Sequence, residues 1–191
     1  RTSSRVWGSR RVIDHGDMMD EECIDLMVKQ GTFVVPSLYF PWMMVEEKRR
    51  TGKSGFGGVE EMEKGLGHSA RILPLAQKAG VKFVVGDDFG IASLPHGEYT
   101  KKLKAYVKGA GISPLEVITW ATKNGAELLG MGADLGTIEP GKLADLLIVD
   151  GDPAKDITVL EDRDNLDVVM KGGQFVTCQL TPSKVRLQKA A

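Results

Sequence analysis

Two short apolar runs, each ending at a side chain able to bind a metal, place the strongest constraint on the fold. The first is VIDHG at residues 12–16, and the second is KFVVGDD at residues 82–88. Such runs are typical of parallel strands that are covered on both faces. In β/α barrels the chemistry takes place where these strands end, at the C-terminal face. A His at one strand end and an Asp at another therefore predict part of a hydrolytic metal site.

The size and charge of the chain exclude several classes of partner. Its 191 residues allow one sizeable core, or one domain with a small appendage. The 25 Lys and Arg nearly balance the 26 Asp and Glu, giving a formal net charge of −1. This balance provides no basic patch for nucleic acid or for an anionic membrane. No apolar run approaches the roughly 20 residues that span a bilayer. We therefore expect no nucleic acid and no membrane partner.

The two cysteines, Cys23 and Cys178, lie far apart in the sequence and belong to no metal-ligand or redox motif. We expect both to be free thiols, which favours a reducing compartment and a cytoplasmic protein.

Strand and helix signals alternate through residues 1–130, which predicts βα units around a parallel sheet. Asp20 is placed to cap a helix that Gly31 ends, with Ile24, Met27 and Val28 as its buried stripe. The remaining strands are expected at residues 32–35 and 82–85, and the remaining helices at 60–79, 98–110 and 113–129.

Two local signals refine these helices. Pro74 should kink the helix at residues 60–79 or divide it into two pieces. Ser113, Pro114 and Glu116 form a capping box with proline at the first helical position, which is a strong helix start.

The pattern changes to β structure after residue 130. Residues 144–149 predict a buried strand, and residues 167–170 and 174–177 flank the turn Lys171-Gly172-Gly173 of a hairpin. We therefore divide the chain into residues 1–130, a small antiparallel unit at 131–180, and a tail at 181–191.

Three residues at the strand ends are candidates for chemistry. His15 precedes Gly16 and would stand at an open strand end, where a neutral imidazole is a common zinc ligand. Asp87 and Asp88 are neighbours on an extended backbone, so only one of them can face the barrel mouth. A carboxylate there can bind a metal and accept a proton from water. For both His15 and Asp88, a purely structural role at a strand end stays open.

Other polar and apolar signals are weaker. His96 would lie in the loop above the barrel, where it is either a substrate contact or an ordinary loop residue. His68 lies inside a helix and is expected to be a surface or hydrogen-bonded core residue. The cluster of Trp42, Met43 and Met44 favours core packing over a ligand pocket. The Gly-rich residues 51–58 lack a Gly-Lys-Ser/Thr ending, so we interpret them as a flexible loop.

With these residues in hand, the chain resembles the metal-dependent amidohydrolases, in particular the imidazolonepropionase-like and Xaa-Pro dipeptidase branch. The resemblance rests on three stretches: VIDHG at 12–16, GDDFG at 86–90 with PHGE at 95–98, and LGTIEPGKLADL at 135–146. It implies a (β/α)₈ barrel with a small β-sandwich domain built from both chain ends. Residues 12–14, 32–35 and 82–86 would then be the sixth, seventh and eighth barrel strands.

By this resemblance His15 is the metal ligand of the sixth strand, and Asp88 is the eighth-strand carboxylate that binds metal and acts in catalysis. It implies a divalent metal, expected to be zinc, with one or two ions in the complete protein. A small hydroxyl residue usually stands where this chain has Asp87. The family's His-x-His pair, its carboxylated lysine and its fifth-strand histidine have no counterparts here.

We therefore expect the C-terminal part of an amidohydrolase that cleaves amide or peptide C–N bonds with metal-activated water. The substrate would be a small amide or a short peptide, the complete protein could form a homo-oligomer, and the chain alone should be inactive. The alternative is a non-catalytic pseudoenzyme or interaction module. A barrel enzyme that binds a phosphorylated ligand would need a phosphate loop, for which residues 89–98 are a poor candidate.

Overall fold

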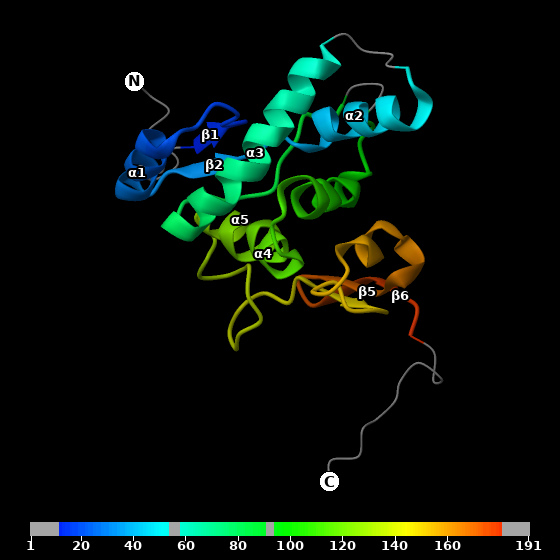
Figure 1. The fold of residues 1–191 in the computed structure, drawn as a ribbon. Coiled ribbons are helices and arrows are strands. Elements are labelled where there is room, and N and C mark those ends of the chain that lie inside the picture. The colour runs from blue at the N-terminus through cyan, green and yellow to red at the C-terminus, as the bar shows by residue number, and fades with distance from the viewer. Residues whose placement is uncertain (1–11, 54–57, 91–93, 181–191) are drawn as a thin grey trace.

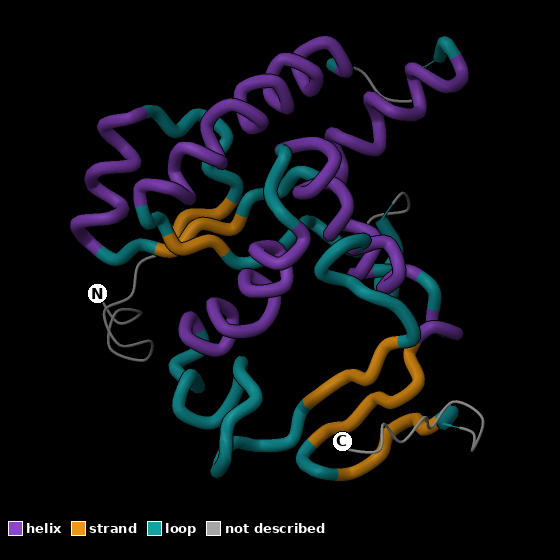
Figure 2. The backbone as a smooth tube through the Cα atoms, turned by 60° about the horizontal axis from the view of Figure 1, so that its bottom comes forward, coloured by secondary structure: helices purple, strands orange, loops and turns teal. Residues whose placement is uncertain are grey.

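A computed structural model describes residues 12–53, 58–90 and 94–180 of the chain. Two separate three-stranded sheets lie apart from one another, with helical segments between them (Figures 1 and 2). The chain is therefore an α/β protein in which a parallel sheet comes first and an antiparallel sheet comes last.

The first sheet is parallel, as the sequence predicts, and its strands follow one another in the order β1-β2-β3. These are β1 (Val12–Asp14), β2 (Phe33–Val35) and β3 (Lys82–Phe83). β2 and β3 are covered by helices, and Val34 and Phe83 have no exposed surface. The prediction that β1 is buried is wrong: Val12 is 42% exposed, because β1 is an edge strand that, unlike the other edge strand β3, is left uncovered by the rest of the described chain.

Helix α1 (Glu21–Gln30) connects β1 to β2 and has the boundaries that its capping residues predict. The Asp20 carboxylate accepts the backbone N–H of Cys23 at 2.9 Å, and Gly31 ends the helix in the left-handed conformation. Ile24 is buried as expected, but Val28 is 41% exposed and lies outside the buried stripe.

Helix α2 (Tyr39–Thr51) was not predicted, because its first turn is rich in aromatic residues and contains Pro41. The signals at its end were present: three basic residues occupy the last turn, and Gly52 ends the helix in the left-handed conformation. Met44 is buried, as core packing requires. Part of the Gly-rich loop, residues 54–57, lies outside the described residues.

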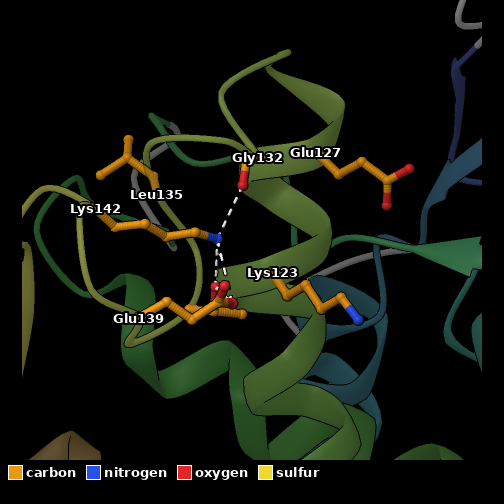
Figure 3. A pocket seen from close by; sticks show the side chains of 7 residues that line it. Lys123, Glu127, Gly132, Leu135, Glu139 and Lys142 are labelled. Carbon is orange, nitrogen blue, oxygen red and sulfur yellow. Dashed lines mark hydrogen bonds and ion pairs between the residues drawn. The ribbon is translucent and has the colours of Figure 1, made fainter.

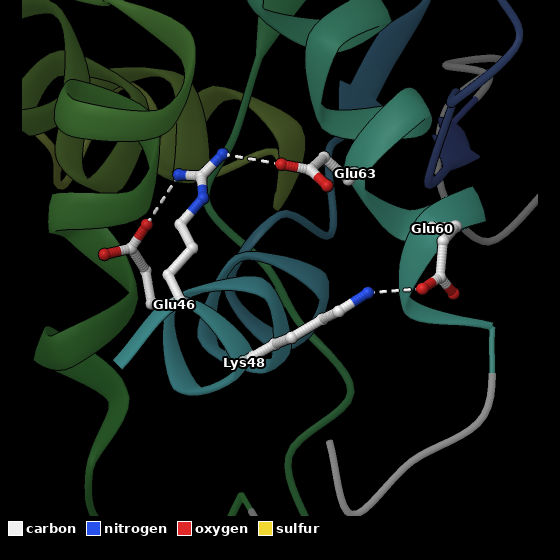
Figure 4. Close-up of polar contacts among 5 residues, drawn as sticks. Glu46, Lys48, Glu60 and Glu63 are labelled. Carbon is white, nitrogen blue, oxygen red and sulfur yellow. Dashed lines mark hydrogen bonds and ion pairs between the residues drawn. The ribbon is translucent and has the colours of Figure 1, made fainter. Parts of the chain in front are cut away.

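Helix α3 (Val59–Ala79) continues through Pro74 as one helix, so the predicted division does not occur. Ion pairs connect its first two turns to α2 (Figure 4). Arg49 binds Glu63 at 2.8 Å and Glu46 at 2.9 Å, and Lys48 pairs with Glu60. These side chains are largely exposed, so each pair contributes little stability. The buried contacts of Met44 and Val45 on α2 with Val59 on α3 hold the two helices together.

The segment predicted as a helix at 98–110 is helical over residues 99–110, but it begins as a 3-10 helix, η1 (Tyr99–Lys102), and continues into a π-helix, η2 (Ala105–Gly109). The next predicted helix contains α4 (Pro114–Thr119), a π turn, η3 (Trp120–Asn124), and α5 (Gly125–Leu128). Its capping box is present as predicted, with both the Ser113 and the Glu116 hydrogen bonds formed.

The two π-helical segments carry the largest buried side chains of the core. Trp120 is 1% exposed and Tyr106 is fully buried. The Trp120 ring lies 4.8 Å from the Phe83 ring and 5.5 Å from the Tyr106 ring, measured between centroids. The two π-helical segments thus place two bulky rings in the core, and the Trp120 ring contacts Phe83 of β3.

The antiparallel sheet contains β4 (Leu146–Val149), β5 (Leu166–Lys171) and β6 (Gln174–Cys178), in that order. The predicted hairpin is present, and Gly172 and Gly173 both adopt positive φ in its turn. The expected burial of β4 is wrong: Leu147 is 52% exposed, because β4 is an edge strand. Two 3-10 helices, η4 (Ile157–Glu161) and η5 (Arg163–Asn165), connect β4 to β5.

One further expectation, that of two unpaired cysteines, is met within the described residues. Cys23 and Cys178 are both free thiols. Across residues 12–53, 58–90 and 94–180, we find no helix with the length and apolar character that crossing a membrane requires.

The capping box at Ser113 predicts a measurable contribution to the stability of α4. Replacing Ser113 by alanine removes the acceptor of the Glu116 N–H and should lower the free energy of unfolding by about 1 kcal/mol. Urea denaturation of Ser113→Ala and Ser113→Thr measures this, since threonine keeps a hydroxyl that can accept from the Glu116 N–H and donate to the Glu116 carboxylate, and should retain most of the stability. Equal losses in the two variants would show that the cap is not what stabilises α4.

Candidate functional site

His15 occupies a strained turn directly at the end of β1. Its backbone N–H donates to the Val35 carbonyl at 2.9 Å, which extends the β1–β2 pairing by one residue. The N–H of Gly16 then donates to the Asp14 carbonyl at 2.9 Å, closing a three-residue turn centred on His15. His15 has a φ of 67°, and no other non-glycine residue of the described chain has a positive φ. A non-glycine residue in this region marks a candidate functional position.

Close packing behind His15 keeps this turn in place. A Cβ on Gly16 would lie 3.0 Å from Cγ1 of Val34, so only glycine fits without displacing its neighbours. The carbonyl of Met19 lies 2.9 Å from Nε2 of His68 on α3. Arg71 can only donate, and it donates to Nδ1 of His68 at 3.1 Å, so Nε2 carries the proton. His68 is thus hydrogen-bonded, as expected, and secures the loop after His15.

Asp88 lies beside His15 although the two belong to different strands. Asp88 Oδ2 is 4.0 Å from Nδ1 of His15, and the two side chains are 68% and 47% exposed. Both follow strands of the same parallel sheet, so the order β1-β2-β3 brings their ends to one edge. The structure therefore brings together the two residues that the sequence singled out.

Asp87 binds different partners from Asp88, as their alternation requires. Its Oδ2 accepts the backbone N–H of Tyr39 at 2.8 Å, and its Oδ1 accepts the N–H of Asp88 at 3.0 Å. Burial raises the pKa of Asp87 above the usual value of an aspartate, while the hydrogen bonds from Tyr39 and Asp88 oppose this rise. Asp87 is therefore a partly buried structural carboxylate beside an exposed one.

The Tyr106 hydroxyl connects the segments that follow β2 and β3. Its hydroxyl lies 2.6 Å from the carbonyl oxygen of Pro36 and 2.7 Å from that of Gly86. Burial raises the pKa of Tyr106, so the hydroxyl keeps its proton and remains a donor. The two loops approach closely here, because a Cβ on Gly86 would lie 2.1 Å from Cγ1 of Val35.

Lys102 is a buried cation under the aromatic residues that follow β3. It is 9% exposed, and its ammonium lies 5.4 Å from the ring centroid of Phe89 and 6.0 Å from that of Tyr99. Burial lowers its pKa below that of an ordinary lysine, and the charge of Asp87 opposes this effect. Sequence reasoning missed this residue, because nothing local distinguishes it from its neighbour Lys101.

His96, the third predicted site residue, contacts Tyr99 rather than His15 or Asp88. Its Nδ1 lies 2.9 Å from the Tyr99 hydroxyl, and the Tyr99 ring meets the Phe89 ring edge-on at 4.9 Å. A Cβ on Gly90 would lie 3.0 Å from Nε2 of His96. His96 is thus part of a cluster of rings that begins one residue after Asp88.

The donor types at His15 and Asp88 fit a divalent metal, but their number is incomplete. Zinc binds imidazole nitrogen and carboxylate oxygen at about 2.0–2.2 Å in tetrahedral geometry, which places two ligand atoms about 3.4 Å apart. The 4.0 Å separation of His15 and Asp88 would therefore have to shorten by roughly 0.6 Å for both to bind one ion. Within the described parts of the chain, no group of three or more His, Cys, Asp or Glu side chains gathers around one point. A catalytic zinc needs about three protein ligands. The site requires further ligands beyond these two.

A cavity of about 290 Å³ lies at the other end of β3. Lys142 projects into it from the 135–146 stretch and donates to the Gly132 carbonyl at 3.0 Å (Figure 3). Glu127, which also lines the cavity, pairs with Lys82 at the start of β3. The cavity therefore lies away from Asp88, and the 135–146 stretch has a structural role there.

Comparison with known proteins agrees with the sequence and the geometry. A model of the amidohydrolase family matches residues 8–176. The chain belongs to this family. Imidazolonepropionase of Solibacter usitatus (strain Ellin6076) is 32% identical over 97 residues, covering 51% of this chain and 23% of its own. Ochratoxinase of Aspergillus niger is 29% identical over 168 residues, covering 85% of this chain and 33% of its own.

Solved amidohydrolase structures show the same likeness. A Xaa-Pro dipeptidase with bound methionine in the active site is 34% identical, with a TM-score of 0.69 over 86% of this chain and 39% of that one. The A. niger ochratoxinase structure has a TM-score of 0.74 at 24% identity, covering 88% of this chain and 37% of that one. The chain spans about a quarter to a third of the length of the two curated relatives.

The strained turn at His15 predicts an unusual substitution pattern. An L-residue in the left-handed region costs about 1–2 kcal/mol, so His15→Gly should be more stable than His15→Ala by about 1 kcal/mol. The same pair of substitutions at Asp25, inside α1, should show the reverse order, since alanine is the better helix former. Urea denaturation measures both pairs. A more stable alanine at position 15 would contradict the strain.

The buried ammonium of Lys102 predicts a pH-dependent stability. Its pKa is lowered on folding, so the unfolded chain binds the proton more tightly, and the free energy of unfolding should rise as the pH approaches about 10.5. Lys102→Met should be more stable than the unmodified chain at neutral pH, with the gain vanishing in alkali. Urea denaturation at several pH values tests this against exposed Lys78→Met. A gain that persists at high pH would refute it.

Proposed function

We propose that this chain supplies the last part of the active site of an enzyme that hydrolyses amide or peptide C–N bonds. The observation that carries the proposal is the 4.0 Å approach of His15 and Asp88, which follow the two outer strands, β1 and β3, of one parallel sheet. Membership of the amidohydrolase family supports it. Neither residue is needed to build the core, because both side chains are largely exposed.

In this proposal His15 and Asp88 hold a divalent metal, with zinc as the expected ion. When bound, such a metal polarises the substrate carbonyl and activates water. Asp88 accepts the proton that water loses and delivers it to the leaving nitrogen. Its exposed carboxylate suits this exchange, because a proton acceptor has to reach both the water and the substrate. His15 serves as a ligand whose backbone is held at the end of β1 by its turn.

The proposed substrate is a small amide or a short peptide. The names of the similar proteins support this class, since they include a Xaa-Pro dipeptidase and an ochratoxinase. His96 is the proposed substrate contact. It lies in the segment that follows Asp88 and contacts Tyr99, which packs against Phe89. A substrate bound at Asp88 would therefore lie close to these rings. Phe89 and Tyr99 offer it aromatic faces.

The remaining ligands are proposed to lie outside these 191 residues. Two observations support this: the described donors are too few for a catalytic metal, and β1 leaves an exposed edge that further parallel strands can pair with. In this arrangement β1, β2 and β3 are strands six to eight of a (β/α)₈ barrel, of which residues 1–130 form only a part. Residues 131–180 form part of a β-sandwich, and residues 181–191 are a tail.

Activity measurements on the complete polypeptide that contains this sequence test the proposal. Chelation should abolish hydrolysis of short peptides and N-acyl amino acids, and zinc or cobalt should restore it. His15→Ala and Asp88→Asn should each lower kcat/KM by about 100- to 10,000-fold. Asp25→Asn removes an exposed carboxylate on α1 and should leave kcat/KM unchanged. The 191-residue chain alone should be inactive.

Two results would contradict the proposal. Full activity in Asp88→Asn would exclude its proton-transfer role. A complete polypeptide that binds no metal and hydrolyses no amide would instead support a non-catalytic module.

A further inference from the structure

One carboxylate joins the segments that follow two neighbouring strands. Asp87 accepts the N–H of Tyr39 on Oδ2 at 2.8 Å and the N–H of Asp88 on Oδ1 at 3.0 Å. Tyr39 is the first residue of α2, which comes after β2, and Asp88 comes after β3. Both carboxylate oxygens are thus used, one on each side of the gap between the two strand ends.

Helix α2 depends on this remote carboxylate at its N-terminus. Leu38 occupies the capping position and makes no side-chain hydrogen bond to the helix. The first N–H groups of a helix have no partner within it, and the positive end of the helix dipole favours a carboxylate there. Asp87 supplies this partner from a different loop, so the start of α2 and the loop after β3 are fixed to one another.

Asp88 has little else to hold it. Its side chain is 68% exposed, so packing against neighbours does not set its direction. Its backbone N–H, in contrast, is held by Asp87, and the preceding Gly86 is tied to Pro36 by the Tyr106 hydroxyl. The position of the Asp88 carboxylate beside His15 is therefore determined mainly through the backbone that Asp87 fixes.

We propose that Asp87 is a positioning residue for Asp88: its two hydrogen bonds hold the loop after β3 against α2, so that the Asp88 carboxylate faces His15. The inference rests on the proposed function, because it concerns the same site. The positioning role requires that two acceptor oxygens, one for the Tyr39 N–H and one for the Asp88 N–H, belong to a single side chain. Asparagine keeps one acceptor oxygen, whereas serine offers a single oxygen on a shorter side chain.

Calorimetric titration of the complete polypeptide with Co²⁺ alone tests this role, because it measures the affinity of the site for the metal. Residues that orient metal ligands typically contribute 10- to 100-fold in metal affinity, so Asp87→Ser should weaken Co²⁺ binding by about this factor. Asp87→Asn should show a smaller loss, since it keeps one of the two hydrogen bonds. Hydrogen exchange should be faster at both the Tyr39 and the Asp88 amides in Asp87→Ser, and at one of the two in Asp87→Asn.

A matched control separates positioning from helix capping. Ser113→Ala removes the cap of another helix, α4, away from the site, and should leave Co²⁺ affinity within about twofold of the unmodified protein. The inference is overturned if Asp87→Ser and Asp87→Asn bind Co²⁺ as tightly as the unmodified protein, or if Ser113→Ala weakens binding equally. Failure of the unmodified protein to bind Co²⁺, or binding unaffected by His15→Ala, overturns the proposed function and this inference together.

Discussion

Parallel pairing of β1, β2 and β3 is the constraint from which the candidate site follows. In a parallel sheet all carboxyl ends lie at one edge, so residues far apart in the sequence meet there without any direct attraction. The register pairs Asp14 with Val35, and the N–H of His15 continues that pairing. His15 and Asp88 are neighbours because their strands lie on either side of β2.

Buried polar groups then convert this approximate closeness into a defined arrangement. Burying a hydroxyl or a carboxylate is costly unless its hydrogen bonds are made. Tyr106 and Asp87 both satisfy this condition by bonding to main-chain groups that follow β2 and β3. The side chains of the exposed pair, His15 and Asp88, are not buried in the core and can act on a ligand. Strain at His15 is the cost of placing an imidazole directly at the strand end.

The features that could be predicted from the sequence are those encoded locally. Continuous apolar runs identified the parallel strands, and Asp20 and Ser113 marked two helix starts through their own side chains. Helix α2 could not be predicted because the residue that caps it, Asp87, lies in a distant loop and its first turn contains Pro41. The exposure of β1 and β4 could not be predicted either, because the apolar content of a strand does not show whether the rest of the chain covers it. Lys102 and Tyr106 owe their roles to tertiary packing alone.

The central claim is that His15 and Asp88 share one metal ion. Anomalous diffraction from crystals of the complete polypeptide, recorded on both sides of the zinc absorption edge, tests this most directly. The account predicts a zinc peak within about 2.0–2.2 Å of a His15 imidazole nitrogen and an Asp88 carboxylate oxygen. A fully occupied zinc peak that contacts neither residue would contradict it.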